Sequence, residues 1–138
     1  MQNIAPDNID IHSSGSRRKA SPVGFRVWLN IARLWTLKDT QAARLLGIPI
    51  SSYRRYKADT ERANLDIGQM ERLSLLLGIY KSLQILLPQP DMADQWLKQP
   101  NSNPLFGGQT PLDRMLKGMT EDVAVVRRHL DAERGGWA

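Results

Sequence analysis

The 138-residue sequence contains no cysteine, which excludes disulfides, thiol nucleophiles and cysteine-based metal sites. It has only two histidines, His12 and His129, and neither has a second metal ligand at a usable spacing. No glycine-rich phosphate loop ending in Lys-Ser or Lys-Thr occurs, and no pair of carboxylates stands in an apolar setting. The sequence therefore predicts no catalytic residues, no metal site, no cofactor and no enzymatic activity.

Long hydrophobic runs and alternating strand patterns are missing as well. No stretch approaches the ~20 apolar residues that a membrane-spanning helix needs. The N-terminus lacks the basic-then-apolar pattern of a signal peptide. Together with the absence of cysteine, these features predict a cytoplasmic protein with no membrane partner. Where apolar residues recur they do so at helical spacing, so the sequence predicts an all-α fold.

The charge that is present is unevenly distributed along the chain. Residues 17–57 contain ten basic side chains and the single acid Asp39, whereas residues 89–138 contain six basic and seven acidic side chains. One-sided clustering of this kind is typical of proteins that bind a polyanion, usually nucleic acid. The alternative is a solvated face that only keeps the protein in solution.

Composition divides the chain into three parts. Residues 1–20 are polar and lack apolar periodicity, which predicts a flexible basic tail. Residues 21–88 predict a helix-turn-helix domain, and residues 89–138, which follow the break at "PQP", predict a second small helical domain. The basic residues of the tail that are available for contacts with phosphates are Arg17, Arg18 and Lys19.

Two short helices joined by a tight turn are predicted in "TLKDTQAARLLGIPISSYRRYK". Asp39 or Thr40 caps the first helix, and Gly47 ends it because a left-handed turn is cheap only for glycine. The second helix begins near Ile50 or Ser51 and presents a polar, basic outer face. This layout is typical of DNA-binding helix-turn-helix motifs, although a purely structural helix pair is the alternative. The predicted DNA-binding residues are Gln41, Ser51, Ser52, Arg54, Arg55 and Lys57.

The segment "IGQMERLSLLLGIYKSLQILL" has apolar residues on more than one face. It predicts one helix, or two helices broken at Gly78, because a glycine inside a helix costs about 1 kcal/mol relative to alanine unless a break or close contact offsets it. Since helix-turn-helix proteins usually bind DNA as dimers, we expect a homodimer held by apolar residues of the 67–87 segment.

The stretch "NSNPLFGGQTPLD" combines two prolines and a glycine pair with the apolar residues Leu105 and Phe106. A rigid apolar loop of this kind suits a preorganised contact surface. Two interpretations of Phe106 stay open, because it could instead fill the core of its own small domain. Thr110 and Pro111 predict the start of a following helix, and Thr120 predicts the start of the next one.

The C-terminal segment "WLKQPNSNPLFGGQTPLDRMLKGMTEDVAVVRRHLDAERGG" resembles the toxin-binding domain of the Xre/MbcA/ParS antitoxin family. The upstream stretches "QAARLLGI" and "ERLSLLLGIYKSL" resemble the Xre-type helix-turn-helix that precedes this domain, so the resemblance covers residues 25–138. The polar stretch "NSN" before Pro104 departs from the family pattern. The shared positions are Trp96, Leu97, Pro100, Asn101, Phe106, Gly107, Pro111, Leu112, Gly118, Arg127, Arg128 and Leu130.

The resemblance implies an antitoxin of a two-gene toxin–antitoxin module. Its partner would be a RES-domain toxin, similar in fold to ADP-ribosylating enzymes, that depletes cellular NAD. The C-terminal domain would cover the active site of the toxin, and the N-terminal domain would bind promoter DNA for autoregulation. The toxin-binding residues expected on this basis are Leu105, Phe106, Gly107, Arg127, Arg128, Arg134 and Trp137.

Trp137 follows Gly135-Gly136 at the end of the sequence, and tryptophan is a common anchor at protein interfaces. We expect Trp137 or the terminal carboxylate to block the pocket of the toxin; the alternative is that Trp137 folds back onto the last helix. A second function also stays open. The chain could be a phage-type helix-turn-helix repressor whose C-terminal part only dimerises or senses a ligand.

Overall fold

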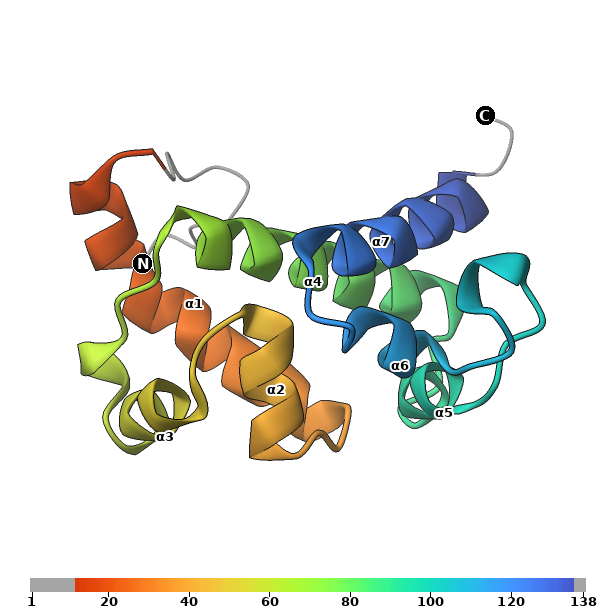
Figure 1. Ribbon diagram of the computed structural model, residues 1–138, viewed down its shortest axis with the longest axis horizontal. Coiled ribbons are helices and arrows are strands. Elements are labelled where there is room, and N and C mark those ends of the chain that lie inside the picture. The colour runs from red at the N-terminus through yellow and green to blue at the C-terminus, as the bar shows by residue number, and fades with distance from the viewer. Residues whose placement is uncertain (1–11, 136–138) are drawn as a thin grey trace. The chain divides into compact units, whose positions relative to one another are not determined.

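The computed structural model describes residues 12–135, and every regular element within that range is a helix (Figure 1). The all-α fold predicted from the sequence is confirmed. No helix of the described range is long and apolar enough to cross a membrane. In chain order the helices are α1 (Ser14–Leu34), α2 (Asp39–Leu46), α3 (Ile50–Ala58), α4 (Ile67–Leu86), α5 (Met92–Lys98), α6 (Pro111–Met115) and α7 (Thr120–Gly135), with short 3-10 turns at Thr60–Arg62 and Pro104–Phe106.

The chain divides into two compact units, residues 1–74 and 75–138. The division falls inside α4, so each unit contains one part of that helix. The N-terminal unit holds α1, α2, α3 and the first turns of α4, and the C-terminal unit holds the rest of α4 with α5, α6 and α7.

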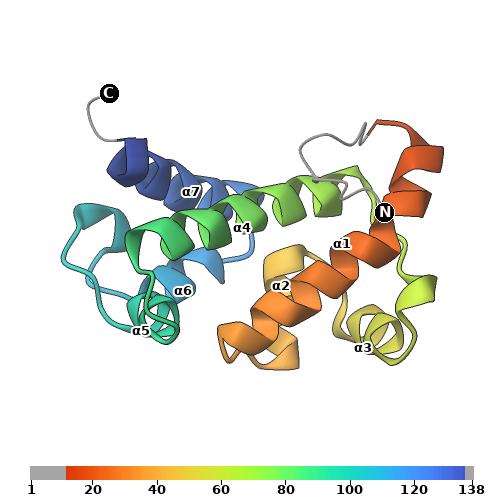
Figure 2. The same ribbon diagram turned by 180° about the vertical axis from the view of Figure 1, so that it is seen from behind.

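Helix α1 begins at Ser14, earlier than the flexible tail predicted for residues 1–20 would allow. The Ser13 side chain caps the helix by accepting a hydrogen bond from the Ser16 N–H group at 3.3 Å. Pro22 lies inside the helix, where it lacks a donor and crowds the preceding turn. The helix continues through Pro22, and both views show its first turns at an angle to the rest of the helix (Figures 1 and 2). Residues 1–11 lie outside the described range.

Aromatic side chains fill the core of the N-terminal unit. Trp28 and Trp35 are almost fully buried and meet edge to face, with ring centroids 5.9 Å apart. The Trp28 indole N–H donates to the Ala42 carbonyl at 3.1 Å, which fixes α2 against α1. Phe25 meets the ring of Tyr53 at 5.4 Å and thereby attaches α3 to the same core.

The turn between α2 and α3 is as predicted. Gly47 ends α2 in the left-handed conformation with φ of 77°, and α3 begins at Ile50. The start of α2 differs from the prediction, because Lys38 occupies the cap position and Asp39 is the first helical residue. Instead of a capping Asp39 or Thr40 side chain, the Gln41 side-chain oxygen accepts from the Lys38 backbone N–H at 2.9 Å.

In the C-terminal unit α4 runs through Gly78 without a break, so the close-contact explanation for this glycine holds. A Cβ atom at Gly78 would lie 2.2 Å from the guanidinium carbon of Arg127, which packs against α4 at this point. Figures 1 and 2 both show α7 alongside this part of α4. The core of the unit contains the buried hydrophobic residues Leu76, Ile79, Leu83, Ala93, Leu97, Phe106, Leu112, Met115, Val123, Val126 and Leu130.

Two predicted helix starts in the C-terminal unit have different outcomes. Thr110 caps α6 as predicted, since its hydroxyl accepts from the Asp113 N–H at 3.0 Å and Pro111 takes the first helical position. Thr120, predicted as the cap of α7, is instead the first residue of that helix. The Asp122 carboxylate accepts from the Met119 N–H at 2.9 Å and satisfies the end of the helix.

Candidate functional site

The outer face of α3 carries the basic side chains that the sequence assigned to DNA. Ser51, Arg54 and Arg55 are exposed, while Tyr53 on the opposite side of the helix is 1% exposed and anchors it in the core. The Arg55 guanidinium donates to the Ser52 hydroxyl at 3.2 Å, so these two side chains lie together on the surface. The helix therefore presents two arginines and two serines outward from a fixed core.

Two other predicted DNA-binding residues already have partners in the structure. The Lys57 ammonium forms an ion pair with Asp39 at 2.8 Å, which joins α3 to the first turn of α2. The Gln41 oxygen is used by the Lys38 N–H, which leaves the amide group of Gln41 to donate outward. The structure thus brings five predicted residues together along α3 and places Gln41 at the start of α2.

Helix α4 holds the turn between α2 and α3 in place. The Gln69 amide donates to the Gly47 carbonyl at 3.3 Å, and the Arg72 guanidinium donates to the Arg44 carbonyl at 3.4 Å. The Gly47 carbonyl gains a partner in this way, and the Arg44 carbonyl accepts the guanidinium in addition to the Gly47 N–H, which lies 3.1 Å away. The outer face of α3 is therefore oriented by contacts with both α1 and α4.

Tyr53 is the described residue whose acidity is clearly changed by its surroundings. Burial of the Tyr53 phenol and, as the smaller cause, the negative charge of the nearby Asp39 carboxylate together raise the pKa of this group to about 12. The phenol consequently stays neutral at physiological pH and serves as a structural anchor for α3.

Residues 101–110 form a loop closed by its own hydrogen bonds. The Asn101 N–H donates to the Gln109 carbonyl at 3.1 Å, which joins the two ends of the loop. The Asn103 side chain accepts from the Leu105 N–H at 2.9 Å and starts the 3-10 turn. Gly107 follows in the left-handed conformation and is exposed, while Leu105 is half-buried. The loop thus holds its turn by hydrogen bonds of its own, and its role as a preorganised contact surface stays a prediction.

Phe106 lies in the core of the C-terminal unit rather than on its surface. It is 3% exposed, and its ring meets Trp96 at 6.0 Å and His129 at 5.6 Å, both edge to face. Of the two interpretations left open by the sequence, the structure supports the one in which Phe106 fills its own core. The ring fixes the loop onto α5 and α7.

The arginines predicted to contact a partner lie in two different settings on α7. Arg127 packs over Gly78 and pairs with Asp131 at 3.3 Å, one turn further along the helix. Arg134 is exposed, and its guanidinium donates to the buried Ser82 hydroxyl at 3.5 Å. These two side chains therefore line the side of α7 that faces α4.

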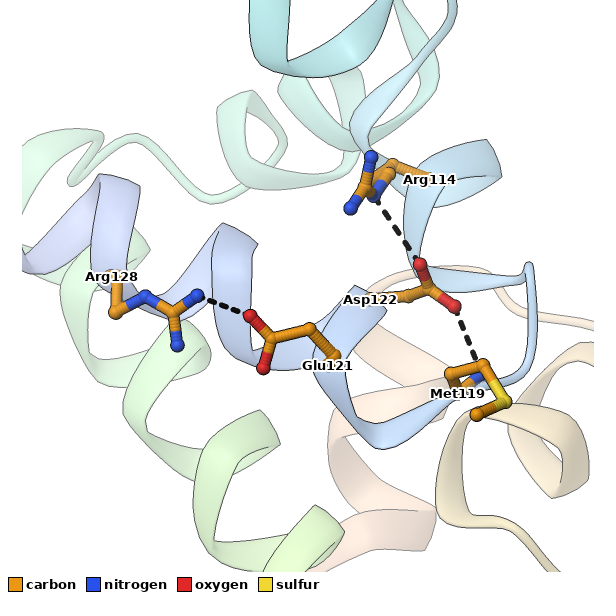
Figure 3. Close-up of polar contacts among 5 residues, drawn as sticks. All are labelled: Arg114, Met119, Glu121, Asp122 and Arg128. Carbon is orange, nitrogen blue, oxygen red and sulfur yellow. Dashed lines mark hydrogen bonds and ion pairs between the residues drawn. The ribbon is translucent and has the colours of Figure 1, made fainter.

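Arg128 lies apart from the other two and pairs with Glu121 on the exposed surface of α7 (Figure 3). Figure 3 also shows the start of the helix, where Asp122 accepts from the Met119 N–H and pairs with Arg114 at 3.5 Å. The Asp122 side chain is largely buried, so this contact fixes α6 to α7. Trp137 lies outside the described residues.

Sequence reasoning missed the acids that hold these arginines. Asp131 stands four residues after Arg127, a helical spacing that favours ion pairs and could have been recognised. Asp122 stands at the third position of α7, where a carboxylate caps a helix start. No local pattern predicts the contact between Gly78 and Arg127, which are 49 positions apart. Within residues 12–135 no group of three His, Cys, Asp or Glu side chains is placed to hold a metal ion.

Comparison with known proteins gives two family matches. Residues 17–78 match the antitoxin Xre-like helix-turn-helix domain, and residues 82–136 match the antitoxin Xre/MbcA/ParS C-terminal toxin-binding domain. The chain is also similar to uncharacterized protein y4oB of Sinorhizobium fredii (strain NBRC 101917 / NGR234). The two are 37% identical over 115 residues, which cover 83% of this chain and 87% of the relative.

Proposed function

The chain belongs to the Xre/MbcA/ParS family of antitoxins, and on that premise we propose that it neutralises a RES-domain toxin and represses its own promoter. The family match assigns an antitoxin role with a helix-turn-helix domain and a toxin-binding domain. Domains of this family are generally non-enzymatic. The RES identity of the toxin, its NAD-depleting activity and the promoter target are the parts that we propose.

The observation that carries the proposal is the separation of the two matches. The helix-turn-helix match falls almost entirely on the N-terminal unit, and the toxin-binding match falls on the C-terminal unit. The basic outer face of α3 belongs to the first unit, and the preorganised loop with the arginines of α7 belongs to the second. Two surfaces of different chemistry on different units suit a protein with two macromolecular partners.

For DNA we propose that α3 enters the major groove. Arg54 and Arg55 would reach base edges, and Ser51 and Ser52 at the start of the helix would contact bases or phosphates. Gln41 would donate its amide N–H groups to a phosphate while its oxygen caps α2, and Lys57 would contact the backbone beside its ion pair.

For the toxin we propose that direct contacts come from exposed and half-buried groups of the C-terminal unit. Leu105 and Gly107 offer the turn of the preorganised loop, and Arg128 and Arg134 offer charge. Phe106 would act indirectly, because it is buried and positions the loop. Arg127, which is half-buried over Gly78, would position α7. A preformed surface loses less conformational entropy on binding, which favours high affinity.

Co-expression with the product of the neighbouring gene, which the proposal requires to be a RES-domain toxin, tests the proposal directly. The wild type should co-purify with the toxin, restore growth and restore cellular NAD. The double variant Arg128→Ala/Arg134→Ala should lose protection and keep promoter binding. Lys81→Ala, which removes an exposed basic residue of α4 in the same unit, is the matched control and should protect like the wild type. If no RES-domain toxin binds, the toxin assignment is wrong even if the DNA assignment stands.

Trp137 is tested separately, by the substitution Trp137→Ala. We propose that this side chain enters the substrate pocket of the toxin, so the variant should still bind promoter DNA but protect cells poorly. Normal protection by Trp137→Ala would move the blocking surface to the 101–110 loop.

A further inference from the structure

The described residues contain a polar groove beside α3 that includes Ser52 of the proposed DNA contacts but no other residue assigned under the proposed function. It has a volume of about 300 Å3 and lies between the first turns of α1, the side of α3 and the segment before α4. We call it the α1–α3 groove and define it by the lining residues Arg17, Arg18, Ser52, Tyr56, Asp66 and Gln69.

Hydrogen bonds fix the walls of the α1–α3 groove. The Ser21 hydroxyl is fully buried, donates to the Arg17 carbonyl at 2.5 Å and accepts from the Leu65 N–H at 2.9 Å. This serine therefore attaches the first turns of α1 to the segment before α4. The Tyr56 hydroxyl donates to the Asn64 carbonyl at 3.4 Å and attaches α3 to the same segment. The basic residues at the start of α1 thus stand on a rigid support.

The charged residues that line the groove are two arginines and one acid. Arg18 is exposed and forms no ion pair with another described residue, and Arg17 lines the groove beside it. The one acid in the lining, Asp66, accepts from the Gln69 N–H at 2.8 Å and caps α4. Lys19, the next basic residue along the chain, does not line the groove. Of these three consecutive basic residues, Arg17 and Arg18 therefore line the groove and Lys19 does not.

The position of the groove relative to α3 identifies its ligand. Ser52 and Tyr56 lie on the groove side of α3, while Lys57 and Asp39 pair on another side. A helix in the major groove of DNA is flanked by a phosphate backbone on each side. A polar, positively charged groove beside such a helix meets one of these two backbones.

We propose that Arg17 and Arg18 each neutralise one backbone phosphate of DNA at the α1–α3 groove, an inference that rests on the proposed entry of α3 into the major groove. These contacts position the protein and carry no sequence information. They make the kinked first turns of α1 part of the DNA-binding surface, in place of the flexible tail that the sequence suggested.

The salt dependence of DNA binding tests the inference in the full-length chain. Each phosphate neutralised contributes about −0.9 to the slope of log affinity against log salt concentration. Arg18→Ala should make this slope shallower by about 0.9 and weaken binding equally on promoter and scrambled duplexes. Arg18→Lys should keep the wild-type slope, because it keeps the charge. Lys19→Ala is the matched control, one residue away and outside the groove, and should leave the slope within about 0.3 of wild type.

Two results would overturn the inference. One is a wild-type slope for Arg18→Ala, and the other is an equal change for Lys19→Ala, which would indicate a general charge effect. Thermal unfolding and toxin binding, measured on each variant, separate a folding defect from a lost phosphate contact. If the wild type binds no DNA at all, the proposed function fails together with the inference. If it binds DNA and Arg18→Ala behaves like wild type, the inference alone fails.

Discussion

At the scale of single residues, the basic side chains of α3 differ in the contacts that they already make. Lys57 is paired with Asp39, and Arg55 donates to Ser52, whereas Arg54 forms no ion pair with another described residue. Removal of Arg54 or Arg55 leaves the core of the N-terminal unit unchanged, because both lie opposite the buried Tyr53. Changes at these two positions should therefore report on DNA recognition and not on folding.

Arg54→Ala and Arg55→Ala are each expected to weaken promoter binding. A bidentate contact between arginine and guanine contributes about 1–3 kcal/mol to discrimination, so the affinity should fall by roughly 5- to 150-fold. Gel shifts at one fixed salt concentration measure the effect, and toxin neutralisation should persist in both variants. Unchanged shifts for both would remove α3 as the recognition helix.

Tyr53 predicts a loss of stability at high pH. The phenol holds its proton more tightly in the folded protein, with a pKa of about 12, than in the unfolded chain, where the pKa is near 10. Deprotonation therefore favours unfolding, so the contribution of Tyr53 is complete below pH 10 and is lost as the pH rises toward 12. Urea denaturation from pH 8 to 11.5 measures this, with Tyr53→Phe as reference. Parallel pH profiles for the two proteins would show that the phenol does not contribute.

At the scale of helices, the sequence predicts those helix ends that are determined by residues close together in the chain. The left-handed end of α2 at Gly47 and the cap of α6 by Thr110 follow from local patterns and are confirmed. The start of α1 is missed, because a serine followed by a proline is itself a typical helix start and Ser21-Pro22 masks the earlier cap at Ser13. The buried position of Phe106 also could not be decided, since it depends on α5 and α7 packing around the loop.

The packing of α7 on α4 predicts that the effect of Gly78→Ala on stability depends on Arg127. In the wild-type background the new methyl group must displace the Arg127 guanidinium, which offsets the helix-propensity gain of about 1 kcal/mol. In an Arg127→Ala background the obstacle is gone, so Gly78→Ala should stabilise the protein by up to about 1 kcal/mol. Thermal unfolding of the two single variants and the double variant gives the coupling. Additive effects would show that Arg127 does not occupy the space above Gly78 in solution.

At the scale of the whole molecule, the structure alters the surface through which we expect the protein to self-associate. The 67–87 segment was expected to hold a homodimer, but Met70, Leu73, Leu76, Ile79 and Leu83 are buried within the chain. Ile67 and Ile85 are the large hydrophobic residues of this segment that remain exposed among the described residues. Helix α1 exposes three others on one face, Val23, Val27 and Leu34, at spacings that suit helix pairing.

We expect a homodimer in solution and on promoter DNA, and light scattering tests this directly. Val27→Asp should produce a monomer if α1 forms the interface, because it places a charge in the centre of the exposed apolar face. Ile85→Asp makes the same change at the site left in the 67–87 segment. Dissociation by Ile85→Asp alone would restore the original assignment, and a monomeric wild type would exclude both interfaces.

The two glycines of the 101–110 loop have a consequence for handedness. Gly107 and Gly108 have φ of 57° and 82°, and a Cβ atom built on either would meet nothing within 4 Å. A lack of space therefore does not explain glycine at these positions. Glycine is required because L-amino acids disfavour positive φ. A D-amino acid prefers positive φ, so D-alanine introduced by chemical synthesis should adopt the native backbone conformation at both positions. Because it restricts the unfolded chain more than glycine does, each substitution should stabilise the protein by about 0.4–1 kcal/mol. L-alanine at the same positions should destabilise the protein, so the two enantiomers of alanine should have opposite effects on the free energy of unfolding.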